Sequence, residues 1–194
     1  ISSYKIASAI ESSPTIFNNT LYIGSYDGKV YALSASSKEP VWAFSTGSPV
    51  VSKPAISKGL LYVSSTNGYL YALNAKDGGL YWKVKLEGFL KASPAVYKNN
   101  VYICDSKGYV YSISSFSGKI NWKIKTKGSI LASVGISDGI VYVPSGDGYL
   151  YAFNAVKGTP LWKFGTTSPV FSSPVINNGV VYFGAENGEV YAIK

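Results

Sequence analysis

The feature that most constrains the fold is an internal repeat of 40 residues that runs through the whole chain. A glycine and a tyrosine recur at this spacing, from Gly28 to Gly188 and from Tyr22 to Tyr182. Four tryptophans share it: Trp42, Trp82, Trp122 and Trp162. Because several residue types keep one register without insertion or deletion, the sequence predicts stacked copies of one supersecondary unit.

One unit reads as four strands, taken here from the copy that starts at Leu61. Residues 61–65, 69–75, 80–86 and 90–97 are rich in β-branched and aromatic side chains and are separated by turn signals. Asn67-Gly68 predicts a two-residue hairpin in which both residues take positive φ. No segment has a helical period, so almost no helix is expected.

Four antiparallel strands in about 40 residues are typical of a propeller blade. A β-sandwich also has short strands and frequent turns, but it gives no reason for a constant register. We therefore predict an all-β protein, a single β-propeller domain over residues 1–194, with five four-stranded antiparallel blades. Their approximate bounds are 8–47, 48–87, 88–127, 128–167, and 168–194 together with 1–7.

The two ends of the chain align with complementary halves of one unit. Residues 1–20 match a second half and residues 181–194 match a first half. We expect residues 1–7 to pair with residues 190–194 as the missing outermost strand, which closes the ring and leaves no unpaired edge there. The alternative is an open arc cut from a ring of seven or eight blades.

Residues 71–82 carry the pattern Tyr-Ala-Leu-Asn-Ala followed by Gly78 and Trp82, and residues 151–162 follow it loosely. This pattern resembles the tryptophan-docking motif of the pyrroloquinoline-quinone-like (quinoprotein-type) repeat propellers. That family holds dehydrogenases and non-catalytic relatives, such as a periplasmic lipoprotein of the outer-membrane assembly machinery. The resemblance implies that each tryptophan docks against the motif alanine and a glycine peptide of the next blade. Ser2 replaces a fifth tryptophan and residues 35–40 lack the glycine, which weakens the expectation at two seams.

The composition excludes several kinds of chemistry. The chain has no histidine, no arginine and a single cysteine, Cys104, so histidine catalysis, histidine metal sites and internal disulfides are ruled out. The quinoprotein dehydrogenases, as the resemblance implies, have eight blades, a calcium ion and a vicinal cysteine pair, which this sequence does not match. Most acidic residues lie in turns, which favours turn formation over a glycosidase pair. We expect no enzymatic activity, no cofactor and no metal, and we read Cys104 as a small buried side chain.

The basic residues are all lysines, and the formal net charge is +8. Five of them alternate with apolar residues on the predicted outermost strands: Lys83, Lys85, Lys123, Lys125 and Lys163. Protection of a sheet edge explains this placement better than a nucleic-acid partner, because arginine and a dense basic cluster are absent. No apolar stretch is long enough to cross a bilayer, so membrane insertion is not expected. The chain lacks an initiating methionine and is expected to be processed or excised from a longer one.

Propellers bind partners where the outermost-to-innermost loops meet the turns between the second and third strands. On that side, departures from the repeat single out candidate partner-binding residues: Lys53, Glu87, Phe89, Lys91 and Lys127, with Tyr26 and Asp27 from a turn. Lys53 replaces a serine that stands at positions 13, 93, 133 and 173. Ordinary drift of loop sequences is the alternative explanation.

The sequence thus predicts a non-catalytic, monomeric scaffold for protein–protein interaction, as an extracytoplasmic module of a secreted or cell-surface protein. One alternative is a propeller that binds a carbohydrate or small ligand at its central face. Because the loops differ from blade to blade, one identical site per blade is disfavoured. The other alternative is a fragment of a larger quinoprotein-like enzyme.

Overall fold

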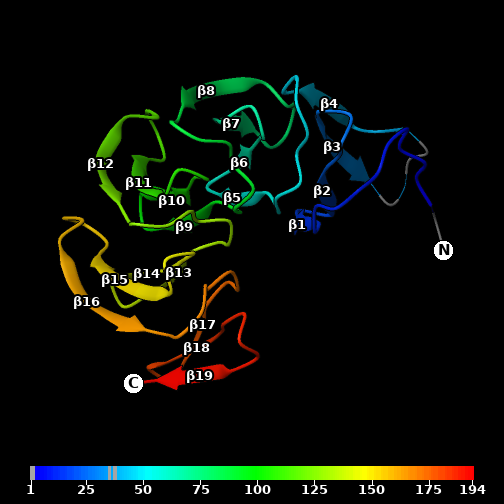
Figure 1. Ribbon diagram of the computed structural model, residues 1–194. Coiled ribbons are helices and arrows are strands. Elements are labelled where there is room, and N and C mark those ends of the chain that lie inside the picture. The colour runs from blue at the N-terminus through cyan, green and yellow to red at the C-terminus, as the bar shows by residue number, and fades with distance from the viewer. Residues whose placement is uncertain (1–2, 35, 37–38) are drawn as a thin grey trace. The chain divides into compact units, whose positions relative to one another are not determined.

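The computed structural model describes residues 3–34, 36 and 39–194, and the strands in this part form five antiparallel sheets in chain order (Figure 1). Within each sheet, every strand is bonded to the next one along the chain. No described residue lies in a helix, so no helix long and apolar enough for a bilayer is found among them. The chain divides into two compact units, Ile1–Pro94 and Ala95–Lys194.

The first unit contains two four-stranded sheets. The first sheet consists of β1 (Thr15–Phe17), β2 (Thr20–Gly24), β3 (Lys29–Ser34) and β4 (Trp42–Ser45). The second consists of β5 (Ala55–Ser57), β6 (Leu60–Ser64), β7 (Tyr69–Asn74) and β8 (Leu80–Lys85). The fourth strand of each sheet alternates between half-buried and exposed residues, which identifies it as the outer edge.

The second unit contains three sheets. The third sheet consists of β9 (Ala95–Tyr97), β10 (Asn100–Cys104), β11 (Tyr109–Ser114) and β12 (Ile120–Lys125). The fourth consists of β13 (Gly135–Ser137), β14 (Ile140–Ser145), β15 (Tyr149–Asn154) and β16 (Pro160–Gly165). The last has three strands, β17 (Val175–Asn177), β18 (Val180–Gly184) and β19 (Val190–Ile193).

The core lies between consecutive sheets rather than on one side of each. In the first unit, Tyr22 and Val30 of the first sheet pack with Leu61, Val63 and Leu73 of the second, all of them buried. The same arrangement recurs in the second unit between the fourth and last sheets. Middle strands are therefore apolar on both faces, and each fully buried Val or Leu contributes roughly 1.5–3 kcal/mol.

The innermost strand is much shorter than predicted. Residues 90–97 were expected to form a strand, but β9 covers only its last three residues. Pro94 precedes the strand directly, and proline has no N–H for a sheet ladder. In the same segment, the Ala92 carbonyl accepts a hydrogen bond from a side chain, Ser64 Oγ of β6, at 2.8 Å.

The prediction of a two-residue hairpin at Asn67-Gly68 is wrong. The amide of Gly68 donates to the Ser65 carbonyl at 2.9 Å, and only Gly68 of the pair has a positive φ. The connection is a type I turn closed by a left-handed glycine. Asn67 suits this turn because its Oδ1 accepts the amide of Tyr69 at 3.0 Å.

Hairpins with two positive φ values do occur, but between the first and second strands of a sheet. Lys58 and Gly59 have φ of 49° and 76°, and Asp138 and Gly139 have φ of 51° and 77°. Asn18 and Asn19 repeat the geometry with φ of 47° and 59°. Such type I′ turns match the twist of the flanking strands, so they set the pairing of the short innermost strands.

Pro144 lies within a regular strand, although proline inside a strand usually marks a bulge or a strand end. It pairs with Leu150 in the β14–β15 ladder without a register shift. At the equivalent position of the first sheet, the Gly24 amide donates to Ser12 Oγ at 3.2 Å and not to a strand. The fourth sheet has Ala132 where the first has Ser12. Proline is tolerated because its missing N–H would have no acceptor there.

The structure does not confirm closure of the ring by the N-terminal segment. The last sheet has three strands, and residues 3–7 form none, while residues 1–2 lie outside the described part. The Tyr4 hydroxyl instead donates to the carbonyls of Ser34 and Glu39, at 3.3 and 2.8 Å. Further along, Ser12 Oγ donates to the Ser52 carbonyl at 2.8 Å. The segment thus satisfies its polar groups on the first unit.

Candidate partner-binding face

Each pair of packed sheets meets at a seam, defined here as a donor face with a tryptophan and a tyrosine against an acceptor face of the next sheet. In the first unit, Trp42 Nε1 and the Tyr22 hydroxyl both donate to the carbonyl of Ala75, at 3.0 and 2.9 Å. A Cβ added at Gly78 would lie 2.7 Å from Trp42 Cε3, so the indole lies directly on this glycine.

The second unit repeats this arrangement atom for atom. Trp122 Nε1 and the Tyr102 hydroxyl donate to the carbonyl of Ala155, each at 3.0 Å. A Cβ added at Gly158 would lie 2.8 Å from Trp122 Cδ2. One carbonyl therefore takes two hydrogen bonds at each of these seams, and the bare glycine lets the ring approach closely.

The other two tryptophans keep their tyrosine neighbour. Trp82 lies 5.9 Å from the ring of Tyr62 and Trp162 lies 5.8 Å from that of Tyr142, centroid to centroid. Trp162 differs from the others in being 40% exposed. The positions where the docking motif departs from the repeat, Ser2 and part of residues 35–40, lie outside the described residues.

The predicted loops and turns lie at one end of the sheets and are bonded to each other. Thr46 in the outermost-to-innermost loop donates its amide to the Gly28 carbonyl at 2.8 Å, and the Thr66 amide donates to the Pro49 carbonyl at 3.0 Å. The second unit has the same bonds, from Thr166 to Gly148 and from Glu186 to Pro169. We call the exposed surface formed by these loops and turns in each unit its loop face.

Tyr26 and Asp27 lie on the loop face of the first unit, and both are exposed. The carboxylate of Glu11, hydrogen-bonded to the Tyr26 hydroxyl, raises the pKa of Tyr26. Asp27 Oδ2 accepts the hydroxyl of Tyr31 at 2.5 Å, and its Oδ1 accepts the Lys29 amide at 3.0 Å. Burial, and then the bond to Asp27, raises the pKa of Tyr31 to about 12. The Asp27 carboxylate is thus engaged in its turn, whereas the Tyr26 ring is open to a partner.

Phe89 and Lys91 lie together in the second loop of the same unit. The Phe89 ring is exposed, and Lys91 Nζ lies 5.9 Å from its centroid, within reach of a cation–π contact. Glu87 and Lys53 are exposed too, and the Lys53 amide donates to Ser93 Oγ at 3.0 Å. This loop face therefore presents exposed aromatic rings beside charges of both signs.

Lys127 belongs to the second unit, whereas the other candidate residues belong to the first. Its amide donates to Asp147 Oδ2 at 2.9 Å, and the same carboxylate oxygen accepts the Tyr151 hydroxyl at 2.8 Å. Burial first, and then this bond to Asp147, raises the pKa of Tyr151. In the second unit, the ring of Phe171 covers Gly146, where an added Cβ would lie 3.0 Å from it.

Asp105 lies in a turn, as expected of most acidic residues, but the sequence analysis did not foresee its burial. It is fully buried, and its carboxylate accepts the Tyr111 hydroxyl at 2.8 Å and the amides of Lys107 and Tyr109 at 2.9 and 3.1 Å. In the first sheet, the residue two positions later accepts the corresponding bonds: Asp27 accepts the Tyr31 hydroxyl and the Lys29 amide. The sequence does contain a signal, which is a pair of linked departures from the repeat. Position 107 holds lysine where the other turns have Asp or Asn, and position 105 of the same turn holds an aspartate instead.

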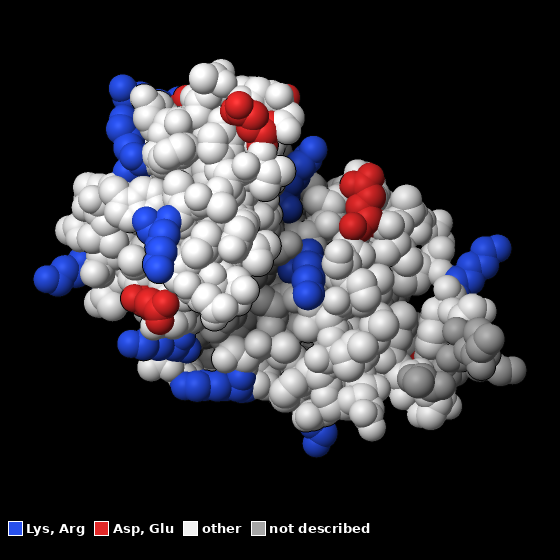
Figure 2. All heavy atoms as spheres, turned by 90° about the horizontal axis from the view of Figure 1, so that it is seen from below, with Lys and Arg blue, Asp and Glu red and all other residues white. Residues whose placement is uncertain are grey.

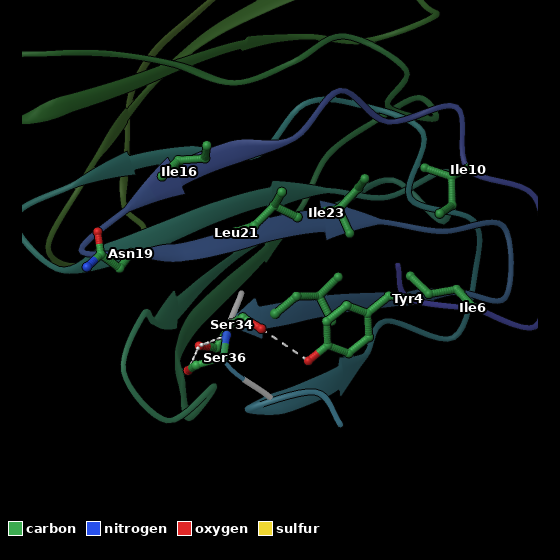
Figure 3. Close-up of a pocket in the computed structure, with 10 residues that line it drawn as sticks. Tyr4, Ile6, Ile10, Ile16, Asn19, Leu21, Ile23, Ser34 and Ser36 are labelled. Atoms are coloured by element: carbon green, nitrogen blue, oxygen red, sulfur yellow. Dashed lines mark hydrogen bonds between the residues drawn. The ribbon is translucent and has the colours of Figure 1, made fainter. Parts of the chain in front are cut away.

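The acidic residues and the cysteine of the described part are its possible metal ligands. Among residues 3–34, 36 and 39–194, no three Cys, Asp or Glu side chains gather as metal ligands. Cys104 is free and buried, and burial together with Asp105 raises the pKa of its thiol. Lysines are spread in small groups over the surface in view, with neutral side chains between them (Figure 2). Two hollows in the described part lie on other surfaces than the loop faces, and Figure 3 shows the one beside Leu21 and Ile23.

The model of the β-propeller family of the beta-alanine-activating enzyme matches residues 1–194. The chain belongs to this β-propeller family. The match covers the entire sequence and, together with the structures below, confirms the resemblance to quinoprotein-type repeat propellers. No curated protein sequence matches the chain.

Solved structures resemble the chain closely in fold and weakly in sequence. BamB from Moraxella catarrhalis has a TM-score of 0.85 at 20% identity, covering 97% of this chain and 59% of that one. Quinohemoprotein alcohol dehydrogenase from Comamonas testosteroni has 0.84 at 15%, covering 96% and 41%. The computationally designed protein Ika8 has 0.83 at 18%, covering 92% and 56%. At these identities the likeness shows the propeller fold alone, and the chain spans between 41% and 59% of their lengths.

Proposed function

We propose that this propeller chain is a non-catalytic scaffold that binds another protein through the loop face of its first unit. The observation that carries the proposal is the exposure of two aromatic rings on this loop face, Tyr26 next to Glu11 and Phe89 next to Lys91. Aromatic side chains surrounded by charged residues are typical of protein-interaction surfaces. Loops held by a sheet scaffold need little ordering on binding.

The acidic side chains support a non-catalytic role. Asp27, Asp105 and Asp147 are each bonded to a tyrosine hydroxyl and to a backbone amide. A general acid or base needs a free position toward a substrate, and these carboxylates are engaged in turn formation instead. We therefore include the absence of enzymatic activity of this chain in the proposal. The activity of a longer protein that contains the chain is a separate question.

A photo-crosslinking experiment tests the proposed face. A benzophenone amino acid is placed at Phe89 in one variant and at Lys58, in the turn at the opposite end of the second sheet, in the control. A protein adduct is expected from the loop-face position and not from the control. Adducts of the same protein from both positions would contradict the proposed face.

The identified partner is then purified and titrated against the chain by calorimetry. Phe89→Ala combined with Lys91→Glu is expected to weaken binding at least about tenfold, because it removes the ring and reverses the adjacent charge. Unchanged affinity would refute the proposal. If the chain binds saturably to a glycan array and Phe89→Ala abolishes this binding, the ligand of the loop face is a carbohydrate and not a protein. The extracytoplasmic location predicted from the sequence is tested separately, by fractionation of the source cells.

A further inference from the structure

Asparagine is followed by glycine at three places in the chain, and the three pairs lie in two kinds of turn. Asn67-Gly68 and Asn187-Gly188 each connect the second and third strands of a sheet, whereas Asn178-Gly179 connects β17 to β18. An asparagine before glycine is chemically labile, because the bare glycine lets its amide nitrogen reach the side-chain carbonyl carbon of the asparagine. The fate of each pair therefore depends on whether the fold holds these two groups apart.

Hydrogen bonds hold both reacting groups of Asn67-Gly68. Asn67 Nδ2 donates to the Thr46 carbonyl at 2.7 Å and to the Tyr71 hydroxyl at 3.0 Å. The Gly68 amide donates to the Ser65 carbonyl at 2.9 Å. The side-chain amide and the nitrogen that would attack it are thus both bonded to other groups.

Asn187-Gly188 is held in the same way. Asn187 Nδ2 donates to Thr167 Oγ1 at 3.0 Å and to Glu189 Oε2 at 2.6 Å. The Gly188 amide donates to the Ala185 carbonyl at 3.1 Å. Because Asn187 is nevertheless exposed, hydrogen bonds and not burial restrain the two reacting groups in this kind of turn.

Asn178-Gly179 forms a type I′ turn that leaves both reacting groups unrestrained. The two residues have φ of 50° and 76°, and both are exposed. Among the described residues, none is hydrogen-bonded to the Asn178 side-chain amide or to the Gly179 amide. Nothing lies within 4 Å of a Cβ added at Gly179, so the turn also has room to rearrange.

The openness of this turn does not depend on what lies beside the last sheet. The fourth sheet has a neighbour on each side within its own unit, and its equivalent turn is Asp138-Gly139. Asp138 is exposed, and nothing lies within 4 Å of a Cβ added at Gly139. Turns of this kind therefore stay open to solvent even in a sheet that is covered on both faces.

We propose that Asn178 is a site of spontaneous deamidation in the folded chain. The Gly179 nitrogen attacks Asn178 Cγ, the bond from Cγ to the side-chain nitrogen breaks, and ammonia leaves with the proton of the Gly179 amide. A five-membered succinimide remains, and a water molecule opens it. Attack of water at the side-chain carbonyl gives aspartate, and attack at the main-chain carbonyl gives isoaspartate, whose backbone has one more methylene group.

The two products affect the fold differently. Aspartate is compatible with the turn, because Asp138 occupies the equivalent position with a φ of 51°. Isoaspartate lengthens a turn that has two residues between the paired positions Asn177 and Val180. Since loop length and turn type set the register of a hairpin, isoaspartate is expected to weaken the pairing of β17 with β18.

Ageing of the folded chain in heavy-oxygen water at mildly alkaline pH tests the proposal, because each converted asparagine takes up the label. Tandem mass spectrometry of the peptides gives the rate at each site. Asn178 is expected to convert at least about tenfold faster than Asn67 and Asn187, whose hydrogen bonds must break first. In the chain unfolded in urea, the three rates are expected to converge. Equal rates in the folded chain, or an equally large difference in the unfolded chain, would overturn the proposal.

A matched variant checks the site and its product. Asn178→Lys copies the turn at Lys58, which has a φ of 49°, and is expected to abolish the isoaspartate that protein isoaspartyl methyltransferase detects in the aged folded chain. An undiminished signal in this variant would contradict the assignment to Asn178. The aged isoaspartate form, separated by chromatography, is expected to unfold at a lower urea concentration than the Asn178→Asp variant. Equal midpoints would contradict the predicted weakening of the β17–β18 pair.

Discussion

The glycine beneath the docked indole offers a sharp test of the seam. Gly158 has a φ of +72°, and an added Cβ would lie 2.8 Å from Trp122 Cδ2 and 2.9 Å from its Cγ. Gly139 has a φ of +77°, and nothing lies within 4 Å of an added Cβ. Alanine at either position incurs the same left-handed backbone cost, so the comparison isolates the effect of crowding the indole.

The magnitudes follow from these two contributions. An L-residue in the left-handed region costs about 1 kcal/mol, which is the whole loss expected for Gly139→Ala. Forcing a methyl group into a packed contact adds about 1–3 kcal/mol, so Gly158→Ala is expected to lose about 3 kcal/mol. With an m-value of about 2 kcal/mol per molar urea, the unfolding midpoints of the two variants differ by about 1 M.

Urea unfolding followed by far-ultraviolet circular dichroism, with indole fluorescence as a second probe, measures this difference. Gly78→Ala against Gly59→Ala repeats the comparison in the first unit, where the added Cβ meets Trp42 and empty space respectively. Equal midpoints for the crowded and open variants in both units would refute the argument that the indole lies on the glycine.

Three further predictions concern single side chains. Trp122→Ala is expected to lower the free energy of unfolding by about 3 kcal/mol, and Trp162→Ala, whose indole is 40% exposed, by clearly less; calorimetric unfolding compares them. Asp105→Ser removes the acceptor of a buried tyrosine hydroxyl and of two amides, and is expected to lower the free energy of unfolding by about 2–3 kcal/mol. Adding Lys107→Asp is expected to restore this stability, because it rebuilds the turn found in the other sheets. If urea unfolding shows no such rescue, Asp105 does not replace the acidic residue missing at position 107. Between about pH 10 and 12, Tyr31 loses its proton in the unfolded chain and keeps it in the folded chain, so the free energy of unfolding falls over this range. Tyr31→Phe is expected to make this fall less steep. A difference titration at 295 nm between the unmodified chain and Tyr31→Phe that places the ionisation of Tyr31 near pH 10 would contradict this prediction.

The repeat alone predicts the middle of every sheet well. The first and second predicted strands of the unit, 61–65 and 69–75, agree with β6 and β7 within one residue at each end. These strands are long, and their side chains are buried on both faces, so their hydrophobic pattern is unambiguous. The resemblance also pointed to the alanine and glycine on which Trp42 docks.

Elements that depend on few backbone hydrogen bonds were predicted less well. The innermost strand is cut to three residues because serine side chains and a proline replace its ladder. The type of the turn at Asn67-Gly68 depends on one φ angle, which composition does not determine. Asp105 could be recognised only together with position 107, since each departure by itself resembles drift.

The candidate binding residues show the limit of reasoning from departures. The structure brings Phe89 and Lys91 into contact and leaves Tyr26 exposed, but it places Lys127 in the other unit. Loop positions that differ from the repeat are visible in the sequence. The distances between their side chains are not, because they depend on the way in which long side chains lie along the surface.

Hydrogen exchange of the indole N–H groups tests the central claim, that Trp42 and Trp122 each donate to a single carbonyl of the next sheet. In a ¹⁵N-labelled chain under native conditions, the indole protons of Trp42 and Trp122 are expected to exchange slowly, because Ala75 and Ala155 accept them, whereas that of Trp162 is expected to exchange rapidly. Equally rapid exchange of all three would contradict the account.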